Sequence, residues 1–166
     1  MTENYLERLF AHNHWANQQI IEACSNLDAR LLDADPKSAT RGSIRITLWH
    51  LVAAQQNYLS LLTGSVPRSS WQAAPDFDQL QKAATMTGEG LIALAREEQA
   101  EALKEKLQTR DGDLVSPWVV IVQAINHATE HREQIKSMLS SLGVTPPNLD
   151  GWAYGEAAGA ITPKPT

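Results

Sequence analysis

The sequence predicts an all-α protein folded as a four-helix bundle. Three observations predict it: four long segments repeat apolar residues every three or four positions, capping residues bound most of them, and Pro- and Gly-containing stretches separate them. The chain has 166 residues, of which 43% are hydrophobic and 20% charged. These values are typical of a globular protein and are most simply explained by a single domain over residues 1–166.

The first two helices follow from their apolar spacing. The first is expected over about residues 4–27, with a stripe of Leu6, Leu9, Asn13, Asn17, Ile20, Cys24 and Leu27. Residues 33–42 interrupt it with Pro36 and a cluster of Ser and Thr. The second helix is expected to begin after Ser43 as N-cap and to end near Gly64, with a stripe of Ile44, Leu48, Leu51, Gln55, Tyr58 and Leu62.

The third and fourth helices lie on either side of a predicted hairpin. Asp76 and Gln79 have the spacing of a capping box before a stripe of Phe77, Leu80, Ala84, Thr87, Leu91 and Leu94. The helical pattern fades between 103 and 115, where Asp111-Gly112 is a turn signal, and a small hairpin is expected. Ser116-Pro117 then opens the last helix, which should end near Leu142 before Gly143.

Composition excludes several classes of function. The net charge of −5 and the lack of any Lys/Arg run argue against a nucleic-acid partner or an anionic membrane surface. No stretch reaches the roughly 18 apolar residues of a membrane span, and the first residues do not form a secretory signal. Cys24 is the only cysteine, so we expect a buried core residue and a cytoplasmic protein without disulfides.

Two histidines on the last helix are the main candidates for chemistry. His127 and His131 lie one turn apart on the stripe Val120, Ala124, His127, His131, Ile135, Met138 and Leu142. Because this stripe faces the bundle, both imidazoles are expected to point inward and to need polar partners. Histidines at i and i+4 project to a common point, so one metal ion would satisfy both.

A third metal ligand is sought among the remaining histidines. His50 lies midway along the second helix, beside the stripe residue Leu51, and can reach inward. His12 and His14 flank Asn13 on the first helix and are less well placed. His50, His127 and His131 would form a three-His site with open coordination positions, which is the layout of a catalytic rather than a structural metal.

The chain resembles the DinB family over nearly its whole length. The segments "GSIRITLWHLVAAQQNYLSLLTG" and "NHATEHREQIKSMLSSLG" are similar to that family's second and fourth helices, and "HNHWANQQII" is similar to its first. The resemblance implies a four-helix bundle whose three metal-binding histidines fall on His50, His127 and His131. Many members carry Asp or Glu five positions after the first of these histidines, where this chain has Gln55.

The resemblance also implies an activity. The family is related to bacillithiol transferases and mycothiol-dependent maleylpyruvate isomerase, which suggests a small-molecule S-transferase or hydrolase with a low-molecular-weight thiol as cosubstrate. A homodimer is expected on the same ground. Zn²⁺ or Ni²⁺ is the expected ion, and Fe or Mn is an alternative. A catalytic ion would act as a Lewis acid, activating water or a thiolate. The alternative function is a non-catalytic stress-response module with a structural metal.

Other interpretations concern residues around the histidines. His127 to His131 also fits the inverted zinc-peptidase pattern, with Glu130 as general base and Glu156 as third ligand, but Glu130 projects about 100° away from His131. Asn13 and Asn17 either line a pocket opposite the metal or form hydrogen bonds inside the bundle. Trp152 and Tyr154 would close the pocket, pack on the bundle end or contact a second subunit. Arg132 is expected to be solvated.

Overall fold

Four long helices form the body of the molecule in this computed structural model, which describes residues 3–36, 42–64, 67–96 and 105–162. They are α1 (Tyr5–Ser25), α3 (Ile44–Thr63), α4 (Phe77–Arg96) and α5 (Pro117–Ser141). The shorter elements are α2 (Ala29–Leu32), the antiparallel hairpin of β1 (Leu107–Gln108) and β2 (Leu114–Val115), and α6 (Gly151–Ala157). The predicted all-α bundle with a small hairpin before the last long helix is confirmed.

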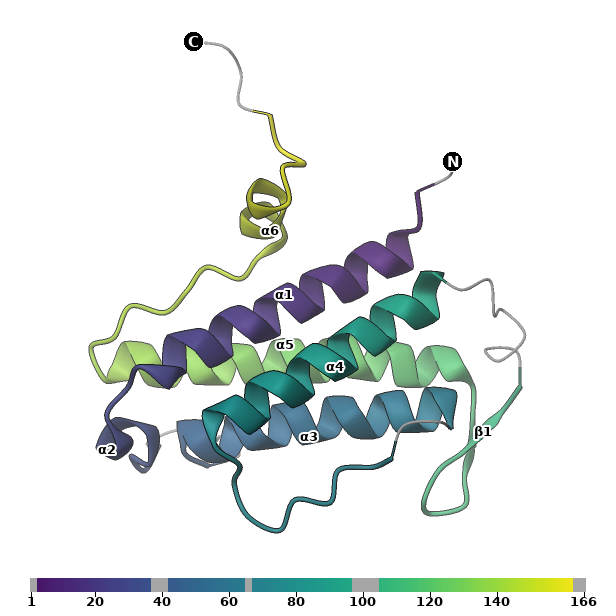
Figure 1. The fold of residues 1–166 in the computed structure, drawn as a ribbon, viewed down its shortest axis with the longest axis horizontal. Coiled ribbons are helices and arrows are strands. Elements are labelled where there is room, and N and C mark those ends of the chain that lie inside the picture. Colours follow the sequence, from purple (N-terminus) through teal and green to yellow (C-terminus); the bar gives the residue numbers. More distant parts are fainter. Residues whose placement is uncertain (1–2, 37–41, 65–66, 97–104, 163–166) are drawn as a thin grey trace.

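The long helices pack in the cyclic order α1, α4, α3, α5. Helices α1 and α5 run in one direction, and α3 and α4 run in the other (Figure 1). The connection between α3 and α4 therefore returns along the length of the bundle, whereas the hairpin joins α4 to α5 at one end. Because α3 packs directly on α5, residues near the middle of these two helices meet.

Local signals in the sequence set the helix ends. The Ser43 side chain accepts a hydrogen bond from the Ile46 amide, and Gly64 ends α3 in the left-handed conformation at φ 65°. Asp76 and Gln79 form the reciprocal capping box, with hydrogen bonds of 2.8 and 3.1 Å. Gly112 takes a positive φ of 93° in the hairpin turn. The predicted starts and stops are thus confirmed where their residues are described.

The predicted stripes form most of the core. Two apolar clusters fill the bundle, one around Leu48, Ala84 and Ile135 and the other around Phe10, Leu59 and Leu91. Leu9 was expected in the core but is 50% exposed, and Phe10 is buried instead. The reason is the helical period: Leu6, Phe10, Asn13 and Asn17 follow one face, and Leu9 lies about 100° from Phe10.

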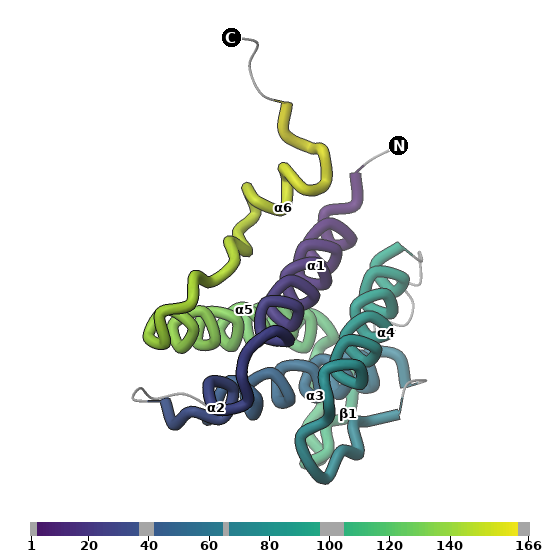
Figure 2. The backbone as a smooth tube through the Cα atoms, turned by 60° about the vertical axis from the view of Figure 1, so that its left-hand side comes forward, coloured from purple at the N-terminus to yellow at the C-terminus, as the bar shows by residue number. Residues whose placement is uncertain are grey.

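The C-terminal segment folds back over α1. After α5 the chain returns across the bundle, and α6 stands beside α1 (Figure 2). The rings of His12, Trp15 and Tyr154 pack together there, and the Trp152 side chain is 76% exposed. Neither α2 nor α6 was predicted. Their apolar repeats are too short to show a helical period, although Asp28 and Asp150 cap them.

Some predicted segments fall outside the described residues: 37–41 of the Ser/Thr-rich loop, 65–66 after α3, 103–104 of the hairpin segment and 163–166 of the tail. Within the described part of the chain, no helix combines the length and apolar character needed to cross a membrane.

Candidate metal centre

Three histidines from two helices converge in the middle of the bundle. The Nε2 atom of His127 lies 3.0 Å from Nε2 of His50 and 3.2 Å from Nε2 of His131. Their possible ligand atoms all lie within 4.8 Å of one another. His131 is buried, and His50 and His127 are half-buried. The structure thus brings together the three histidines that the sequence selected.

The contact made by Nδ1, the second ring nitrogen of His131, indicates which tautomer this histidine adopts. Its Nδ1 lies 2.8 Å from the Gln134 side-chain oxygen, which can only accept a hydrogen bond. This contact favours the tautomer with hydrogen on Nδ1, whose Nε2 lone pair faces His127. The three Nε2 atoms thus lie close together, with His127 Nε2 between those of His50 and His131.

A single cation fits this donor set. Nitrogen ligands of a tetrahedral ion with bonds of about 2.0–2.1 Å lie about 3.3 Å apart. The two close Nε2 separations, 3.0 and 3.2 Å, match this spacing. Imidazole nitrogen is also a preferred ligand of Zn, Cu, Fe and Ni. The three-His group is therefore compatible with binding of one metal ion.

One aromatic side chain packs directly against the site. The ring of Tyr58, two turns along α3 from His50, meets the His127 ring edge-on at a centroid separation of 5.6 Å. Such perpendicular contacts are a favourable arrangement for aromatic rings. With Gln134 on the His131 side and Tyr58 on the His127 side, the orientation of two of the three imidazoles is fixed by neighbours.

Arg132 is not solvated, and the prediction that it would be was wrong. Only 3% of Arg132 is exposed. Its Nη1 donates to Oδ1 of Asn13 at 2.7 Å and of Asn17 at 2.6 Å, and its Nη2 donates to Thr129 Oγ1 at 3.0 Å. Burial lowers the pKa of Arg132 to about 10, opposed by the negative charge of Glu133. Three side-chain oxygens solvate this cation inside the bundle.

Gln55 completes this buried layer. Its Oε1 accepts from the amides of Asn13 and Asn17 at 3.1 and 2.8 Å, and its Nε2 donates to Thr87 Oγ1 at 2.7 Å. Asn13 and Asn17 therefore form hydrogen bonds inside the bundle, which was one of the two interpretations of them. The neutral amide of Gln55, at the position where the resemblance places a carboxylate in many family members, joins α1, α3 and α4.

The remaining histidines lie apart from the three-His group. His12 contacts the Leu149 carbonyl oxygen through Nε2 at 2.8 Å. His14 packs against Gly88 of α4, and burial lowers its pKa. Neither belongs to the group, so His50 is the third histidine that the described residues supply.

The peptidase interpretation and a cysteine nucleophile gain no support. Glu130 and Glu156 are exposed and stand outside the three-His group. Cys24 is fully buried, and burial raises its pKa to about 12, so the thiol stays protonated and inaccessible. The expectation that Cys24 is a core residue is confirmed.

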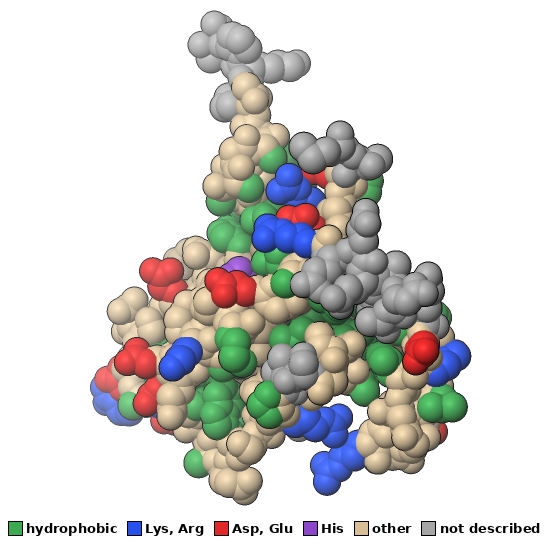
Figure 3. Space-filling view, turned by 45° about the vertical axis from the view of Figure 1, so that its right-hand side comes forward, with side chains coloured by type: hydrophobic (Ala, Val, Ile, Leu, Met, Phe, Trp, Pro, Cys, Tyr) green, Lys and Arg blue, Asp and Glu red, His purple; other side chains and the backbone are tan. Residues whose placement is uncertain are grey.

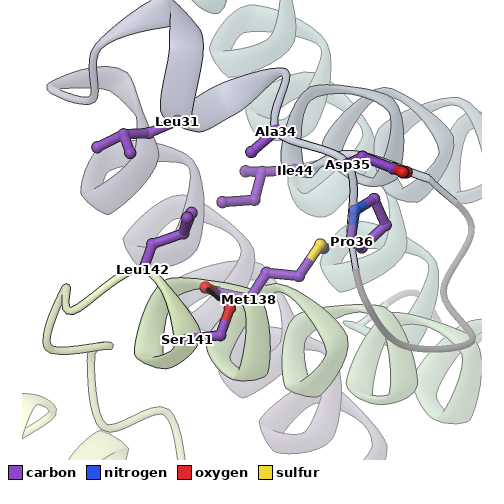
Figure 4. Close-up of a pocket in the computed structure, with 8 residues that line it drawn as sticks. All are labelled: Leu31, Ala34, Asp35, Pro36, Ile44, Met138, Ser141 and Leu142. Atoms are coloured by element: carbon purple, nitrogen blue, oxygen red, sulfur yellow. Dashed lines mark hydrogen bonds between the residues drawn. The ribbon is translucent and has the colours of Figure 1, made fainter.

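Two of the cavities that border α3 are relevant to the site. The first, of about 200 Å³, lies between α2 and the C-terminal part of α5, where the side chains of Ile44, Met138 and Leu142 surround a common space (Figure 4). Among the described residues that line it, Asp35 carries the one carboxylate. The second, of about 250 Å³, includes the ring of His50 in its wall. Only the second adjoins the three-His group.

Sequence reasoning missed Arg132 and gave Gln134 no role. A signal for Arg132 was present: Ala128, Arg132, Ile135 and Leu139 continue a second buried row beside the histidine stripe. A face this wide is expected for a helix that contacts two neighbours, and α5 packs on both α1 and α3. The contact of Gln134 with His131 follows from their i, i+3 spacing.

Comparison with known proteins agrees with the fold and the sequence motifs. A solved structure of a DinB-like protein from Bacillus cereus ATCC 10987 superimposes with a TM-score of 0.68 at 15% sequence identity, covering 85% of this chain and 93% of that one. No curated protein matches the chain. The model of the DinB family matches residues 1–164. Because that match spans nearly all of the sequence, the chain belongs to the DinB family.

Proposed function

We propose that this protein is a metal-dependent enzyme acting on small molecules, of the S-transferase or hydrolase type, with one divalent ion held by His50, His127 and His131. The observation that carries the proposal is the convergence of three imidazole Nε2 atoms at the packed middle of α3 and α5. Imidazole nitrogen is a preferred ligand of divalent transition metals, and nitrogen atoms at these separations suit the coordination shell of one ion. A bound ion would supply Lewis acidity to a donor atom of the substrate.

The surrounding residues orient the ligands. Gln134 accepts the Nδ1 proton of His131 and so keeps its Nε2 free for coordination. Tyr58 holds the His127 ring from the side. The packed α3–α5 interface keeps His50 opposite the other two. This arrangement fixes three ligands on rigid helices and leaves further coordination positions of the ion to small molecules.

The ligand set suggests which ion is bound. Three imidazoles without a carboxylate suit Zn²⁺ or Ni²⁺, and Fe is an alternative. Mn is a weaker match because it prefers oxygen ligands. The amide of Gln55 is held by Asn13, Asn17 and Thr87. The donor set therefore does not favour an oxygen-preferring ion.

Titration with Zn²⁺ and Ni²⁺, followed by elemental analysis after desalting, tests the site. We expect about one ion per chain in the wild type and strongly reduced binding in His127→Ala. His12→Ala is a matched control, because His12 lies against Leu149 outside the group. Equal metal retention in wild type and His127→Ala would exclude the proposed site.

The activity needs a separate test. The metal-loaded protein is incubated with low-molecular-weight thiols and an activated aryl halide, or with an activated ester, and thioether or acid is quantified. Metal-dependent turnover that is lost in His127→Ala supports an enzyme. Tight metal binding without turnover or any ligand-induced rise in melting temperature supports the alternative, a stress-response module with a structural metal. A structural site is usually closed by four protein ligands, and the described residues supply three.

A thiol cosubstrate and a cytoplasmic location are proposed together. Low-molecular-weight thiols remain reduced in the cytoplasm, and a chain whose only cysteine is buried forms no disulfide there. This part of the proposal stands on the family relationship and on the cysteine content.

A homodimer is also proposed. Several large apolar side chains remain at the surface of the described part of the chain, among them Tyr5, Leu9, Trp118, Val122 and Trp152. Apolar groups reach the surface in several places on the face shown in Figure 3. Exposed apolar area of this kind often marks a protein interface. Light scattering at micromolar concentration should give twice the chain mass, and a single species of 18.3 kDa would exclude the dimer.

A further inference from the structure

The cavity beside His50 has the form of a small-molecule site. It has a volume of about 250 Å³ and is lined by Ile46, Trp49, Ala53, Asn57, Ser69 and Trp71 together with His50. The α3 residues of its wall recur at intervals of three and four, so they form one stripe that spans about 16 Å of helix. The opposite wall is the returning segment between α3 and α4. This segment runs beside α3 in Figure 1.

Hydrogen bonds hold the two walls together. Gln56 Nε2 donates to the Pro67 carbonyl at 3.0 Å, and the Ser69 amide donates to Asn57 Oδ1 at 3.1 Å. Trp71, two residues further on, packs against the main apolar cluster. The segment is therefore tied to α3 at both sides of the cavity, and the site is formed before any ligand enters, which reduces the entropic cost of binding.

The lining selects a class of ligand. Two indole rings, from Trp49 and Trp71, offer flat apolar faces. None of the described lining residues is Asp, Glu, Lys or Arg, so in the metal-free protein an ionised group would lose hydration without an oppositely charged partner. Asn57 and Ser69 lie together at the other end and bring amide and hydroxyl groups. A cavity of about 150 Å³ holds benzene, so this volume admits one substituted ring.

We propose that this cavity binds a planar, uncharged ring or conjugated group of the substrate, with a polar substituent directed to Asn57 and Ser69. His50 belongs both to this wall and to the three-His group, so the cavity adjoins the proposed metal centre through the His50 ring. The inference deepens the proposed function by naming a substrate class. The role of this ligand in catalysis depends on the proposed function, whereas its binding depends on the cavity alone.

Three matched probes test the class: benzamide, its anionic analogue benzoate, and the non-planar cyclohexanecarboxamide. Binding is followed by NMR through the indole N–H signals, assigned with Trp49→Phe and Trp71→Phe. Benzamide should shift both signals saturably, with a dissociation constant of about 1 mM, within reach of so few atoms. The other two probes should bind at least about tenfold more weakly. Trp118, 66% exposed on α5, is the internal control.

Two variants separate the cavity from general effects. Ala53→Leu fills the cavity without changing a ligand and should abolish the benzamide shifts. Ala73→Leu, at an exposed position of the returning segment, should leave them unchanged. Equal binding of all three probes, or full binding by Ala53→Leu, would overturn the inference.

The probes are measured in metal-free protein and again after zinc loading, with zinc content determined in parallel. Benzamide binding in a protein that takes up no zinc would support the cavity and refute the metal centre. One zinc per chain without any benzamide shift would refute the cavity and leave the metal centre standing.

Discussion

At the scale of single residues, the contact between His131 and Gln134 should control metal affinity. The Gln134 oxygen accepts the Nδ1 proton at 2.8 Å and so fixes the tautomer whose Nε2 faces the site. Replacing such a partner commonly lowers metal affinity about 10–100-fold. We expect Gln134→Leu to weaken Zn²⁺ binding by that factor in a competition titration, and Gln134→Glu, which keeps an acceptor, to restore most of it.

Gln123→Leu is the matched control for this prediction, because Gln123 is exposed on the same helix. Its zinc affinity should equal that of the wild type. If Gln134→Leu also binds zinc with unchanged affinity, the side chain of Gln134 plays no part in orienting His131.

Arg132 is the second residue whose role can be measured. Replacing it with Met keeps an unbranched apolar stem but leaves Oδ1 of Asn13 and of Asn17 without their charged donor. Each buried polar group without a partner lowers the free energy of unfolding by about 1–3 kcal/mol. Removing the buried guanidinium also removes its desolvation penalty, which offsets part of this loss. We expect the free energy of unfolding in urea to fall by about 2–4 kcal/mol. Arg8→Met, at a mostly exposed ion pair, should change it by about 0.5 kcal/mol or less.

An Arg132→Met protein as stable as the wild type would show that the cost of burying the guanidinium cancels all of its hydrogen bonds. The contacts of Arg132 also explain why the prediction of a solvated side chain was wrong. Arginine is rarely buried, so its position beside His131 suggested solvent. Only the amides of Asn13 and Asn17, which α1 brings to it, make burial possible, and these partners are 119 and 115 positions distant in sequence.

At the scale of the helices, α4 approaches its two neighbours closely at glycines, α1 at Gly88 and α3 at Gly90. A Cβ on Gly88 would overlap the His14 ring, and one on Gly90 would come within 2.6 Å of Leu59 Cδ2. Glycine weakens a helix by about 1 kcal/mol relative to alanine, so these positions look unfavourable from local propensity alone. Close packing of α4 against α1 and α3 requires them. Helix α4 therefore contains two glycines, although glycine has a low helix propensity.

Gly88→Ala should therefore destabilise the protein despite the gain in helix propensity. We expect the free energy of unfolding to fall by about 1–3 kcal/mol, because the new methyl group forces His14 or the whole helix to move. In a His14→Ala background the same substitution should be neutral or stabilising, giving a coupling energy of comparable size in a double-mutant cycle.

Gly151→Ala provides the comparison, since nothing lies within 4 Å of the added group at that helical position. Stability should stay constant or rise slightly. Loss of stability on Gly88→Ala that persists unchanged in the His14→Ala background would exclude the contact between α1 and α4 as its cause.

How far the sequence predicts the structure differs between local and long-range features. Caps and turns such as Ser43, Asp76 with Gln79, and Gly112 depend on neighbours in the chain, and the structure confirms them. The convergence of His50 on His127 was predictable because each lies near the middle of its helix, on or beside the apolar stripe that faces the bundle. The middles of two helices that pack side by side must meet. The cavity was not, because Trp71 reaches it only through the path of the segment between α3 and α4.

At the scale of the whole molecule, the proposed ion would link α3 to α5 and should stabilise the fold. A ligand that binds only the folded state raises the free energy of unfolding by about 2.7 kcal/mol at a free concentration 100 times its dissociation constant. For a chain of this size, this corresponds to a rise in melting temperature of about 5–10 °C. Zinc should produce that rise in the wild type and in His12→Ala, and chelation should reverse it.

His127→Ala gives the decisive contrast for this linkage. The variant removes the nitrogen that lies closest to both other ligands, at 3.0 and 3.2 Å, so zinc should no longer shift its melting temperature. In the absence of metal it should melt close to the metal-free wild type, because the His127 side chain is only half-buried. A zinc-dependent rise of equal size in His127→Ala would mean that the stabilising ion binds elsewhere, and α3 and α5 would then be held together by packing alone.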